Sequence, residues 1–370
     1  MNYWNERTRG LSPYVPGEQP RDRRFIKLNT NENPYPPSPR VSEAILRALS
    51  GGAAPGDQLR LYPDPACTEL RRAAAEKYRV KPEQVFAGNG SDEVLAFAFG
   101  AVFASAGASG GGVPPVLFPD ITYSFFPVYA GLWDIPFRTM PLGDDFSLRA
   151  GDYLRPAGGV IFPNPNAPTG RLLPLAGVLA IAEYHKKTSV VIVDEAYGPF
   201  AGEAESAVPH IRSYPNLLTV HTLSKFASLA GLRVGFAIGN EELIEGLCRL
   251  RDSFNSYTLD RLALAAAAAA LSDGSYYEGI AKRVIATRER VSAALRDLGF
   301  EVIPSRANFI FIRLPRRPGA GLFAALRERG FLTRRFDRDR ISGYLRVSIG
   351  TDEDMDAFLG ECGKIAASGL

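Results

Sequence analysis

The chain has 370 residues, of which 46% are hydrophobic and 22% are charged, and its formal net charge is +3. These values are typical of a globular enzyme of two or three domains and exclude a fibrous or intrinsically disordered protein. Because the net charge is small for this length, neither nucleic acid nor an anionic membrane surface is expected as the main partner.

Cysteine and histidine are rare and scattered. The three cysteines, Cys67, Cys248 and Cys362, lie far apart, and the chain has only three histidines. This spacing fits neither a disulfide framework nor a Cys-x-x-Cys metal site, so no metal is expected. Residues 1–20 lack the apolar core of a secretion signal, and no run of roughly 18 apolar residues occurs. We therefore expect a cytoplasmic protein.

The first part of the chain predicts an arm followed by two helices. Residues 11–37 are dense in proline and asparagine, which excludes a long helix or a central strand and predicts an extended arm. Helical spacing begins at Ser42 and is broken at Gly51, and a second helix is predicted over 67–78.

A strand, a glycine turn and a helix follow at residues 85–93. Ser91 is predicted to cap this helix, with Asp92 and Glu93 in its first turn. A helix N-terminus that follows a glycine is suited to binding an anion. The glycine-rich piece at 107–112 lacks both a lysine and a helix start, so it is interpreted as a flexible loop.

The middle of the chain alternates between apolar runs and segments with helical spacing. The runs are unbroken, as in strands covered by helices on both faces, and this predicts an α/β fold with a mostly parallel sheet. Functional side chains are then expected at the carboxyl ends of these strands. The runs lie at 116–118, 160–162, 190–193, 217–220 and 234–238.

The last third of the chain predicts a smaller α+β domain. Helical spacing runs over 241–271 and again over 275–298, and two strand-like runs at 308–314 and 344–349 flank a helix around 322–329. We predict three parts: an arm (1–40) that joins the small domain, a large domain (41–260) and a small domain (261–370).

Lys225 and Asp194 are the candidate catalytic pair. Each follows an apolar run, and about 30 residues separate them, roughly one strand–helix–strand unit, so both are expected at one edge of the sheet. A lysine at a strand end can also be an ordinary surface residue, but desolvation makes a buried one nucleophilic. A lysine beside a buried carboxylate is what pyridoxal 5'-phosphate requires, for its aldehyde and its ring nitrogen.

The other groups that this cofactor needs are also present at strand ends. Backbone N–H groups at a helix N-terminus, a hydroxyl and a guanidinium would hold its phosphate, while one tyrosine binds the phenolic oxygen and another stacks on the ring. The candidates are Gly90, Ser91, Asp92, Ser224 and Arg233 for the phosphate, Tyr197 for the oxygen and Tyr123 for the ring.

Motifs along nearly the whole chain carry a family resemblance. The chain resembles the fold-type I pyridoxal-phosphate aminotransferases and, within that superfamily, the histidinol-phosphate aminotransferases. The central motifs are typical of the superfamily and the N-terminal ones of the subfamily. They are Pro13-Tyr-Val-Pro-Gly, Leu28-Asn-Thr-Asn-Glu-Asn-Pro, Leu61-Tyr-Pro-Asp-Pro, Gly88-Asn-Gly-Ser-Asp-Glu, Asn164-Pro-Asn-Ala-Pro-Thr-Gly, Asp194-Glu-Ala-Tyr, Thr222-Leu-Ser-Lys, Gly231-Leu-Arg and Leu345-Arg-Val-Ser-Ile-Gly-Thr.

The resemblance implies roles for individual residues. Lys225 forms the Schiff base with the cofactor and moves the substrate's proton, and Asp194 holds the ring nitrogen. Tyr62 reaches the cofactor phosphate from the other subunit of a homodimer. Substrate anions are bound by Arg346, with Arg334 and Tyr14 completing the pocket, whereas the neighbouring arginines are interpreted as a solvated basic face. These neighbours are Arg335, Arg338 and Arg340.

One position departs from the family pattern. The family has asparagine directly before Pro-Thr-Gly, and this chain has Ala167 there. The hydrogen bond to the cofactor's phenolic oxygen must then come from Asn166, from Asn164 or from Tyr197 alone. We choose Asn166.

The reaction implied by the resemblance is transamination between histidinol phosphate and 2-oxoglutarate, which yields imidazole-acetol phosphate and glutamate in histidine biosynthesis. An aromatic amino-acid aminotransferase and a threonine-phosphate decarboxylase-like lyase of the same fold remain alternatives. A non-catalytic regulator that binds the same cofactor is disfavoured, because no basic helix-turn-helix segment is visible.

Overall fold

The computed structural model describes residues 3–20, 24–108 and 112–368. The glycine-rich piece that was predicted to be a flexible loop lies partly outside the described residues, and so do parts of the predicted arm.

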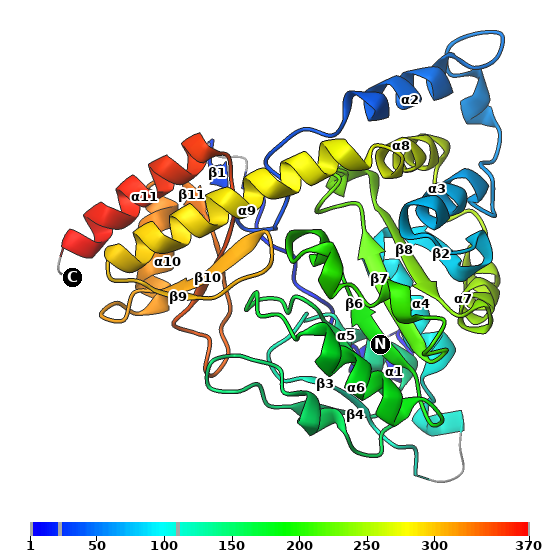
Figure 1. The fold of residues 1–370 in the computed structure, drawn as a ribbon, viewed down its shortest axis with the longest axis horizontal. Helices are drawn as coiled ribbons and strands as arrows, with labels where there is room; N and C mark the ends of the chain where they lie inside the picture. Colours follow the sequence, from blue (N-terminus) through cyan, green and yellow to red (C-terminus); the bar gives the residue numbers. More distant parts are fainter. Residues whose placement is uncertain (1–2, 21–23, 109–111, 369–370) are drawn as a thin grey trace.

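The larger sheet forms the centre of the molecule (Figure 1). Within the described residues it has seven strands in the order β2-β8-β7-β6-β5-β3-β4. The pairs among β3, β4, β5, β6 and β7 are parallel, and β8 is antiparallel to β7 and β2. A mostly parallel sheet is confirmed. The strands are β2 (Val85–Asn89), β3 (Val116–Pro119), β4 (Phe137–Met140), β5 (Gly159–Pro163), β6 (Val191–Asp194), β7 (Leu217–Thr222) and β8 (Val234–Gly239).

Helices cover both faces of this sheet, which explains the unbroken apolar runs. In β6, Val191 and Val193 join one buried cluster and Ile192 joins the other. The helices α4, α5 and α7 contribute to the cluster of Ile192, and α6 contributes to the opposite one. Their bounds are α4 (Gly90–Val102), α5 (Phe126–Trp133), α6 (Leu175–His185) and α7 (Glu241–Phe254).

Two expectations about secondary structure are corrected, and one strand of the larger sheet was missed. The helix α4 begins at Gly90, so Ser91 lies in its first turn and does not cap it. The helical pattern over 241–271 is two helices, because Asp260 starts α8 (Arg261–Leu271) by accepting hydrogen bonds from the N–H groups of Leu262 and Ala263. The strand β4 was not predicted, since three of its four residues are exposed and it carries no apolar run.

The N-terminal helices pack at one end of the molecule. α1 (Glu6–Gly10) lies in the arm, and α2 (Pro39–Ser50) and α3 (Thr68–Tyr78) both pack against α8. Figure 1 shows α2 projecting from the body of the molecule, with the long helix α9 (Gly274–Asp297) running from this side toward the smaller sheet.

A second, antiparallel sheet lies at the other end of α9, with the order β12-β13-β10-β9. A parallel pair joins β1 of the arm to β11, so the arm docks on the C-terminal part of the chain. The predicted domain limits stay a prediction. The elements here are β1 (Ile26–Lys27), β9 (Glu301–Ile303), β10 (Phe309–Arg313), α10 (Gly319–Glu328), β11 (Phe331–Leu332), β12 (Arg334–Arg335), β13 (Leu345–Ser348) and α11 (Asp352–Ala367).

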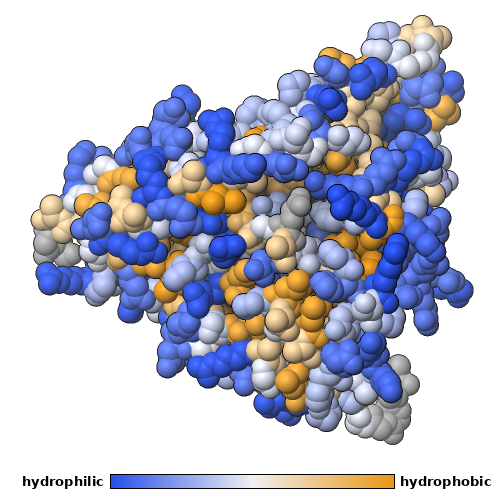
Figure 2. All heavy atoms as spheres, in the orientation of Figure 1, coloured by the Kyte–Doolittle hydropathy of each residue, from blue (hydrophilic) through white to orange (hydrophobic). Residues whose placement is uncertain are grey.

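The surface in the same orientation is mostly hydrophilic, with hydrophobic residues gathered near α6 (Figure 2). Among the described residues, no helix is both long enough and apolar enough to cross a membrane.

Candidate active site

A cavity opens where the central strands β5, β6 and β7 end. Asp194 is the last residue of β6, and Lys225 follows the end of β7. The cavity brings together eight of the predicted site residues. Its lining is Ser91, Asp92, Tyr123, Pro163, Ala167, Asp194, Ala196, Tyr197, Thr222, Ser224, Lys225 and Arg233.

Lys225 lines the cavity, and the pKa of its amine is lower than that of an ordinary lysine. Burial, helped by the positive charge of Arg346, lowers the pKa of Lys225 to about 8. Its Nζ donates to the carbonyl oxygen of Thr30 at 3.0 Å, so the arm holds the amine in place. The amine therefore loses its proton at a lower pH than the amine of an ordinary lysine does.

Asp194 shows the opposite shift. Burial raises the pKa of Asp194 to about 7, and the nearby carboxylate of Asp92 adds to the effect. Its Oδ1 accepts a hydrogen bond of 3.0 Å from the N–H of Ala196. Asp194 and Lys225 line the same cavity without forming an ion pair with each other, within the described residues. The site thus holds a buried carboxyl group that a cationic partner would ionise.

The end of the cavity at α4 gathers groups that can bind an anion. The first N–H groups of α4 have no partner within the helix, and Arg233 reaches this helix, with its Nη2 3.0 Å from the carboxylate of Asp92. The other terminal nitrogen, Nη1, lies 3.5 Å from Ser224 Oγ. Gly90 has φ +78°, and a Cβ there would lie 2.5 Å from Arg233 Nη2. Only glycine permits this approach.

Tyr123 lines the cavity from the loop after β3. Its hydroxyl donates to Asp92 Oδ1 at 2.6 Å, and its ring meets Phe126 edge-on with 5.9 Å between centroids. The ring is thus held at both ends, as a wall against which a flat ligand can lie.

Asn166 does not line this cavity, and its expected contact stays a prediction. Its Nδ2 donates to Ile121 O and to Thr169 Oγ1, each at 3.0 Å, and its Oδ1 is buried without a hydrogen-bond partner among the described residues. The amide of Asn164 exchanges two hydrogen bonds with the main chain of Leu173. From this loop, Ala167 lines the cavity instead.

An asparagine that sequence reasoning missed contacts Tyr197. Asn31, from the arm, donates from its Nδ2 to the hydroxyl of Tyr197 at 3.0 Å. It belongs to the motif that begins at Leu28, but nothing in the spacing of the sequence connects position 31 with position 197.

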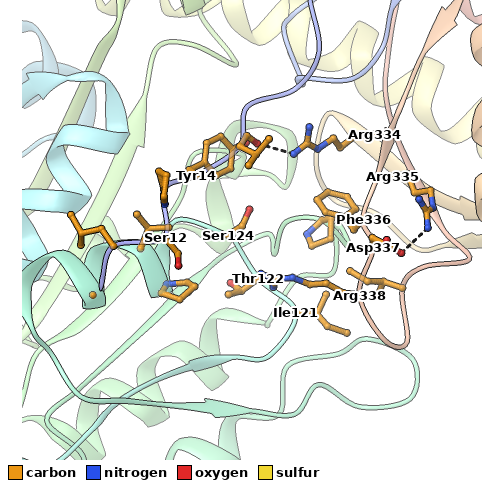
Figure 3. Close-up of a pocket in the computed structure, with 18 of the residues that line it drawn as sticks. Ser12, Tyr14, Ile121, Thr122, Ser124, Arg334, Arg335, Phe336, Asp337 and Arg338 are labelled. Carbon is orange, nitrogen blue, oxygen red and sulfur yellow. Dashed lines mark hydrogen bonds and ion pairs between the residues drawn. The ribbon is translucent and has the colours of Figure 1, made fainter. Parts of the chain in front are cut away.

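A larger cavity of about 560 Å³ lies beside the first one, between the arm, the loop after β3 and the segment after β12 (Figure 3). Tyr14 stacks on Phe125 in its wall, with 4.2 Å between ring centroids. Arg334 donates to the carbonyl oxygens of Val15 and Pro16, and so ties the arm to the small sheet.

The neighbouring arginines do not all belong to a solvated basic face. Arg335 and Arg338 line the larger cavity, where Arg335 pairs with Asp337 at 2.7 Å and Arg338 extends toward Thr122 (Figure 3). Arg340 instead pairs with Asp120 at 3.1 Å. The larger cavity is therefore electropositive on the side of the small sheet.

Arg346 lies directly opposite Arg334 across the pair β12–β13. Its Nη2 donates to Asn29 O at 2.9 Å, and the guanidinium lies over the ring of Phe309, 5.5 Å from the centroid. Burial lowers the pKa of Arg346. Among the described residues, its Nε is a buried donor without a hydrogen-bond partner. A buried arginine with an unused donor is suited to binding an incoming anion.

Tyr62 is not part of the cavity in its own chain. Its side chain is exposed, and its ring stacks on Tyr257 with 4.5 Å between centroids. Within the described residues, it does not line the cavity that holds Lys225.

The comparison of sequences gives close relatives over nearly the whole chain. Residues 23–361 match the family described as aminotransferase class I and II. The chain is 53% identical to a histidinol-phosphate aminotransferase of Aromatoleum aromaticum, with 96% of this chain and 97% of that protein covered. It is also 53% identical to a histidinol-phosphate aminotransferase of Clostridium acetobutylicum, with the same coverage.

Solved structures show the same fold. A histidinol-phosphate aminotransferase from Sinorhizobium meliloti, in complex with pyridoxal-5'-phosphate, matches with a TM-score of 0.85 and 24% identity, over 100% of this chain and 99% of that one. An aspartate aminotransferase from Thermus thermophilus with maleate gives a TM-score of 0.81 and 19% identity, over 99% and 100%. At these identities the likeness concerns the fold, and the predicted fold class is confirmed.

Proposed function

Because the chain belongs to the aminotransferase class I and II family, we propose that it interconverts histidinol phosphate and 2-oxoglutarate with imidazole-acetol phosphate and glutamate, in histidine biosynthesis. The relatives at 53% identity are named for this activity. The geometric observation that carries the proposal is the pair formed by Lys225 and Asp194, which face one cavity with pKa values near neutrality and do not neutralise each other.

The cavity fits pyridoxal 5'-phosphate. An amine, a carboxyl group, a phenol and an anion-binding helix end lie around one space, as the aldehyde, ring nitrogen, phenolic oxygen and phosphate of this cofactor require. When bound, the cofactor supplies an aldehyde that links to amines and a cationic ring that withdraws electrons from the substrate's α carbon.

The residues of the chain supply the proton transfers. Lys225, with a pKa of about 8, would take a proton from the substrate's α carbon and deliver it to the cofactor carbon that carried the aldehyde. Asp194 would hold the ring nitrogen in its protonated form, since a cationic partner would ionise this buried carboxyl group. The hydroxyl of Tyr197 would donate to the phenolic oxygen.

The anion-binding groups hold and orient the ligands. The N-terminal N–H groups of α4, the hydroxyl of Ser224 and the guanidinium of Arg233 are assigned to the cofactor phosphate. Both half-reactions bring an anion to the substrate side, the side-chain carboxylate of glutamate or the phosphate of histidinol phosphate. Planar guanidinium groups bind either one, which suits Arg334 and Arg346 to both half-reactions, with Tyr14 beside them.

We assign the active form to a homodimer in which Tyr62 reaches the cofactor phosphate of the partner subunit. The exposure of Tyr62 and its absence from the cavity of its own chain support this assignment.

Comparison of amino donors at fixed 2-oxoglutarate tests the proposed substrate. Histidinol phosphate is expected to give the highest kcat/KM, because the larger cavity presents arginines to a phosphate. If phenylalanine or tyrosine gives the higher value, the enzyme is an aromatic amino-acid aminotransferase. Release of CO2 from threonine phosphate would identify a lyase.

A further inference from the structure

Tyr197 lines the cofactor cavity beside a wall that lacks a side-chain amide. Tyr197 is buried among Ala167, Ala196, Ala307 and Phe309, all of which are apolar. In the loop that contains Ala167, both asparagine side chains donate to main-chain carbonyl oxygens, and neither asparagine lines the cavity. The arm therefore supplies the amide partner of this phenol, through Asn31.

Ser348 fixes the orientation of the Asn31 amide. Its Oγ accepts a hydrogen bond of 2.8 Å from the N–H of Asn31 and donates its proton to Asn31 Oδ1 at 3.1 Å. With Oδ1 engaged in this way, the Nδ2 group is the one that faces Tyr197. Asn308 adds a further hydrogen bond, from its Nδ2 to Asn31 O at 3.0 Å. Asn31 is 1% exposed, so water does not compete for these contacts.

The direction of the hydrogen bond between Asn31 and Tyr197 decides whether the phenol can donate toward the cavity. Because Asn31 Nδ2 donates, Tyr197 Oη accepts, and the hydroxyl proton of Tyr197 stays available to the cavity. We propose that Asn31 is a positioning residue that holds Tyr197 as a hydrogen-bond donor toward the cofactor's phenolic oxygen, in place of the amide that Ala167 cannot supply. The inference rests on the proposed function insofar as it takes pyridoxal phosphate to occupy the cavity.

The same segment also contacts the substrate side. Asn29, two residues before Asn31, accepts a hydrogen bond from Arg346, and Arg346 lies two residues before Ser348 on β13. Arg346 and Ser348 on β13 therefore both contact the segment of the arm that contains Asn31.

The backbone at Asn31 determines which variants give a clear result. Its φ is +57°, a left-handed conformation that glycine and aspartate adopt more easily than alanine does. Asn31→Gly removes the amide without straining the backbone. Asn31→Asp keeps the shape but replaces the donor with an acceptor, which draws the hydroxyl proton of Tyr197 away from the cavity.

A pH titration of the visible absorption of cofactor bound to Lys225 tests the proposal without measuring activity. Hydrogen-bond donors at the phenolic oxygen stabilise its negative charge and so favour the deprotonated form of the bound cofactor. In Asn31→Gly, the pKa of the spectral transition is expected to rise by about half a unit to one unit. Asn31→Asp is expected to raise this pKa further, and Ser348→Ala to raise it less.

A second substitution and a control separate this role from a general loosening of the arm. Ala167→Asn, introduced into Asn31→Gly, places an amide in the cavity wall and is expected to return the pKa toward the wild-type value. The control is Asn29→Ala, because the Asn29 side chain donates to Glu18 O and does not touch Tyr197; no shift is expected.

The outcomes distinguish the inference from the proposed function. A wild-type protein that stays colourless with added pyridoxal phosphate contradicts both. Yellow Asn31→Gly and Asn31→Asp proteins with the wild-type spectral pKa contradict the role of Asn31 alone. A shift in Asn29→Ala as large as that in Asn31→Gly also contradicts it, since the effect would then come from the arm as a whole.

Discussion

At Lys225 and Asp194, burial moves two pKa values toward neutrality from opposite directions. The same physical cause therefore gives one residue a usable lone pair and leaves the other ready to take a negative charge when a cation arrives. An ion pair between them would cancel both effects. The hydrogen bond from Lys225 to the Thr30 carbonyl engages the amine without supplying a neutralising charge.

Replacing Lys225 with alanine is expected to remove both the visible cofactor band and transamination. The loss in kcat is expected to be roughly 10³-fold or more, because the covalent link and the proton carrier disappear together. Absorbance of the reconstituted protein and single-turnover assays measure the two effects. Lys186→Ala is the control, since this lysine pairs with Glu183 on the surface of α6 and is expected to change neither. A variant at Lys225 that keeps the band would contradict the assignment.

Asp194→Asn is expected to stabilise the cofactor-free protein at high pH. The folded state keeps a proton on Asp194 up to about pH 7, whereas the unfolded chain releases it near pH 4, so the free energy of unfolding falls as pH rises through this window. Asparagine has no carboxyl group to ionise, so the variant does not lose this free energy of unfolding as the pH rises. The gain in the free energy of unfolding is expected to grow by roughly 2 to 3 kcal/mol between about pH 5 and about pH 8.

Urea unfolding of the cofactor-free protein at both pH values measures this gain. Asp145→Asn is a matched control, because hydrogen bonds from Ser147 lower the pKa of that exposed carboxylate, and its neutral variant is expected to bring no gain at high pH. An Asp194→Asn protein with the pH dependence of the wild type would show that Asp194 is ionised in the folded cofactor-free state.

The sequence allowed us to predict the site residues that directly follow strands. It did not reveal the residues that come together only when distant parts of the chain pack. Lys225, Asp194 and Tyr197 could be placed in one site because parallel strands bring their carboxyl ends to one edge. The choice of Asn166 could not be secured from the sequence, because the direction of a side chain in a proline-rich loop depends on local hydrogen bonds that a one-dimensional pattern does not specify. Asn31 was missed because its contact with Tyr197 depends on how the arm docks.

At the scale of elements, the strands β12 and β13 place Arg334 and Arg346 opposite each other. Arg346→Lys is expected to lower kcat/KM by roughly 10- to 100-fold for both glutamate and histidinol phosphate, because a lysine cannot form the paired hydrogen bonds of a planar fork. Arg334→Lys is expected to affect histidinol phosphate more than glutamate. Steady-state kinetics with each donor measure the difference.

The residue next to Arg334 provides the control for these kinetics. Arg335→Lys replaces a side chain that pairs with Asp337, and a smaller change is expected for both donors. Equal losses at all three arginines would mean that they act through their combined positive charge and do not form specific contacts.

The N-terminus of α4 depends on Gly90. In Gly90→Ala, the added Cβ would meet Arg233 Nη2 at 2.5 Å and the left-handed backbone would be strained, so the guanidinium must leave the anion site. The affinity for pyridoxal phosphate is expected to fall roughly tenfold, the equivalent of one weakened charged hydrogen bond. Fluorescence titration of the cofactor-free protein measures the change.

Gly246→Ala in α7 is the matched control for that substitution. A Cβ at Gly246 meets nothing within 4 Å, so the variant is expected to keep the cofactor affinity and to gain a few tenths to about 1 kcal/mol of stability from better helix propensity. Unchanged cofactor affinity in Gly90→Ala would remove this helix end from the phosphate site.

Elements with strong apolar patterns were predictable, and the short or polar ones were not. The strands β5, β6, β7 and β8 are buried along their whole length, which explains why unbroken apolar runs revealed them. The strands β1 and β12 have two residues each, include no fully buried side chain and exist because a partner strand lies beside them. Such elements carry almost no periodic signal of their own.

For the whole molecule, a test by complementation follows from the proposed homodimer. Lys225→Ala and Tyr62→Ala homodimers are each expected to have low activity. In a mixed dimer, the subunit that keeps Lys225 receives an intact Tyr62 from its partner, so one native site forms and about half of the wild-type activity is expected to return. Differently tagged subunits allow the mixed dimer to be purified and assayed.

The two homodimers, purified in the same way, are the controls for this test. A mixed dimer no more active than the average of the two would place Tyr62 outside the partner's site. An active monomer in a sedimentation experiment would contradict the homodimer altogether.

The docking of the arm also sets the order in which the site can be assembled during synthesis. The arm is made first, yet β1 pairs with β11, and the hydrogen bond between Asn31 and Ser348 spans 317 positions. The arm, which contacts Lys225 and Tyr197, can therefore complete its docking only after almost the whole chain has left the ribosome. Contacts of such long range close late and slow folding. A chain truncated before β13 should thus retain its large sheet while lacking a finished catalytic centre.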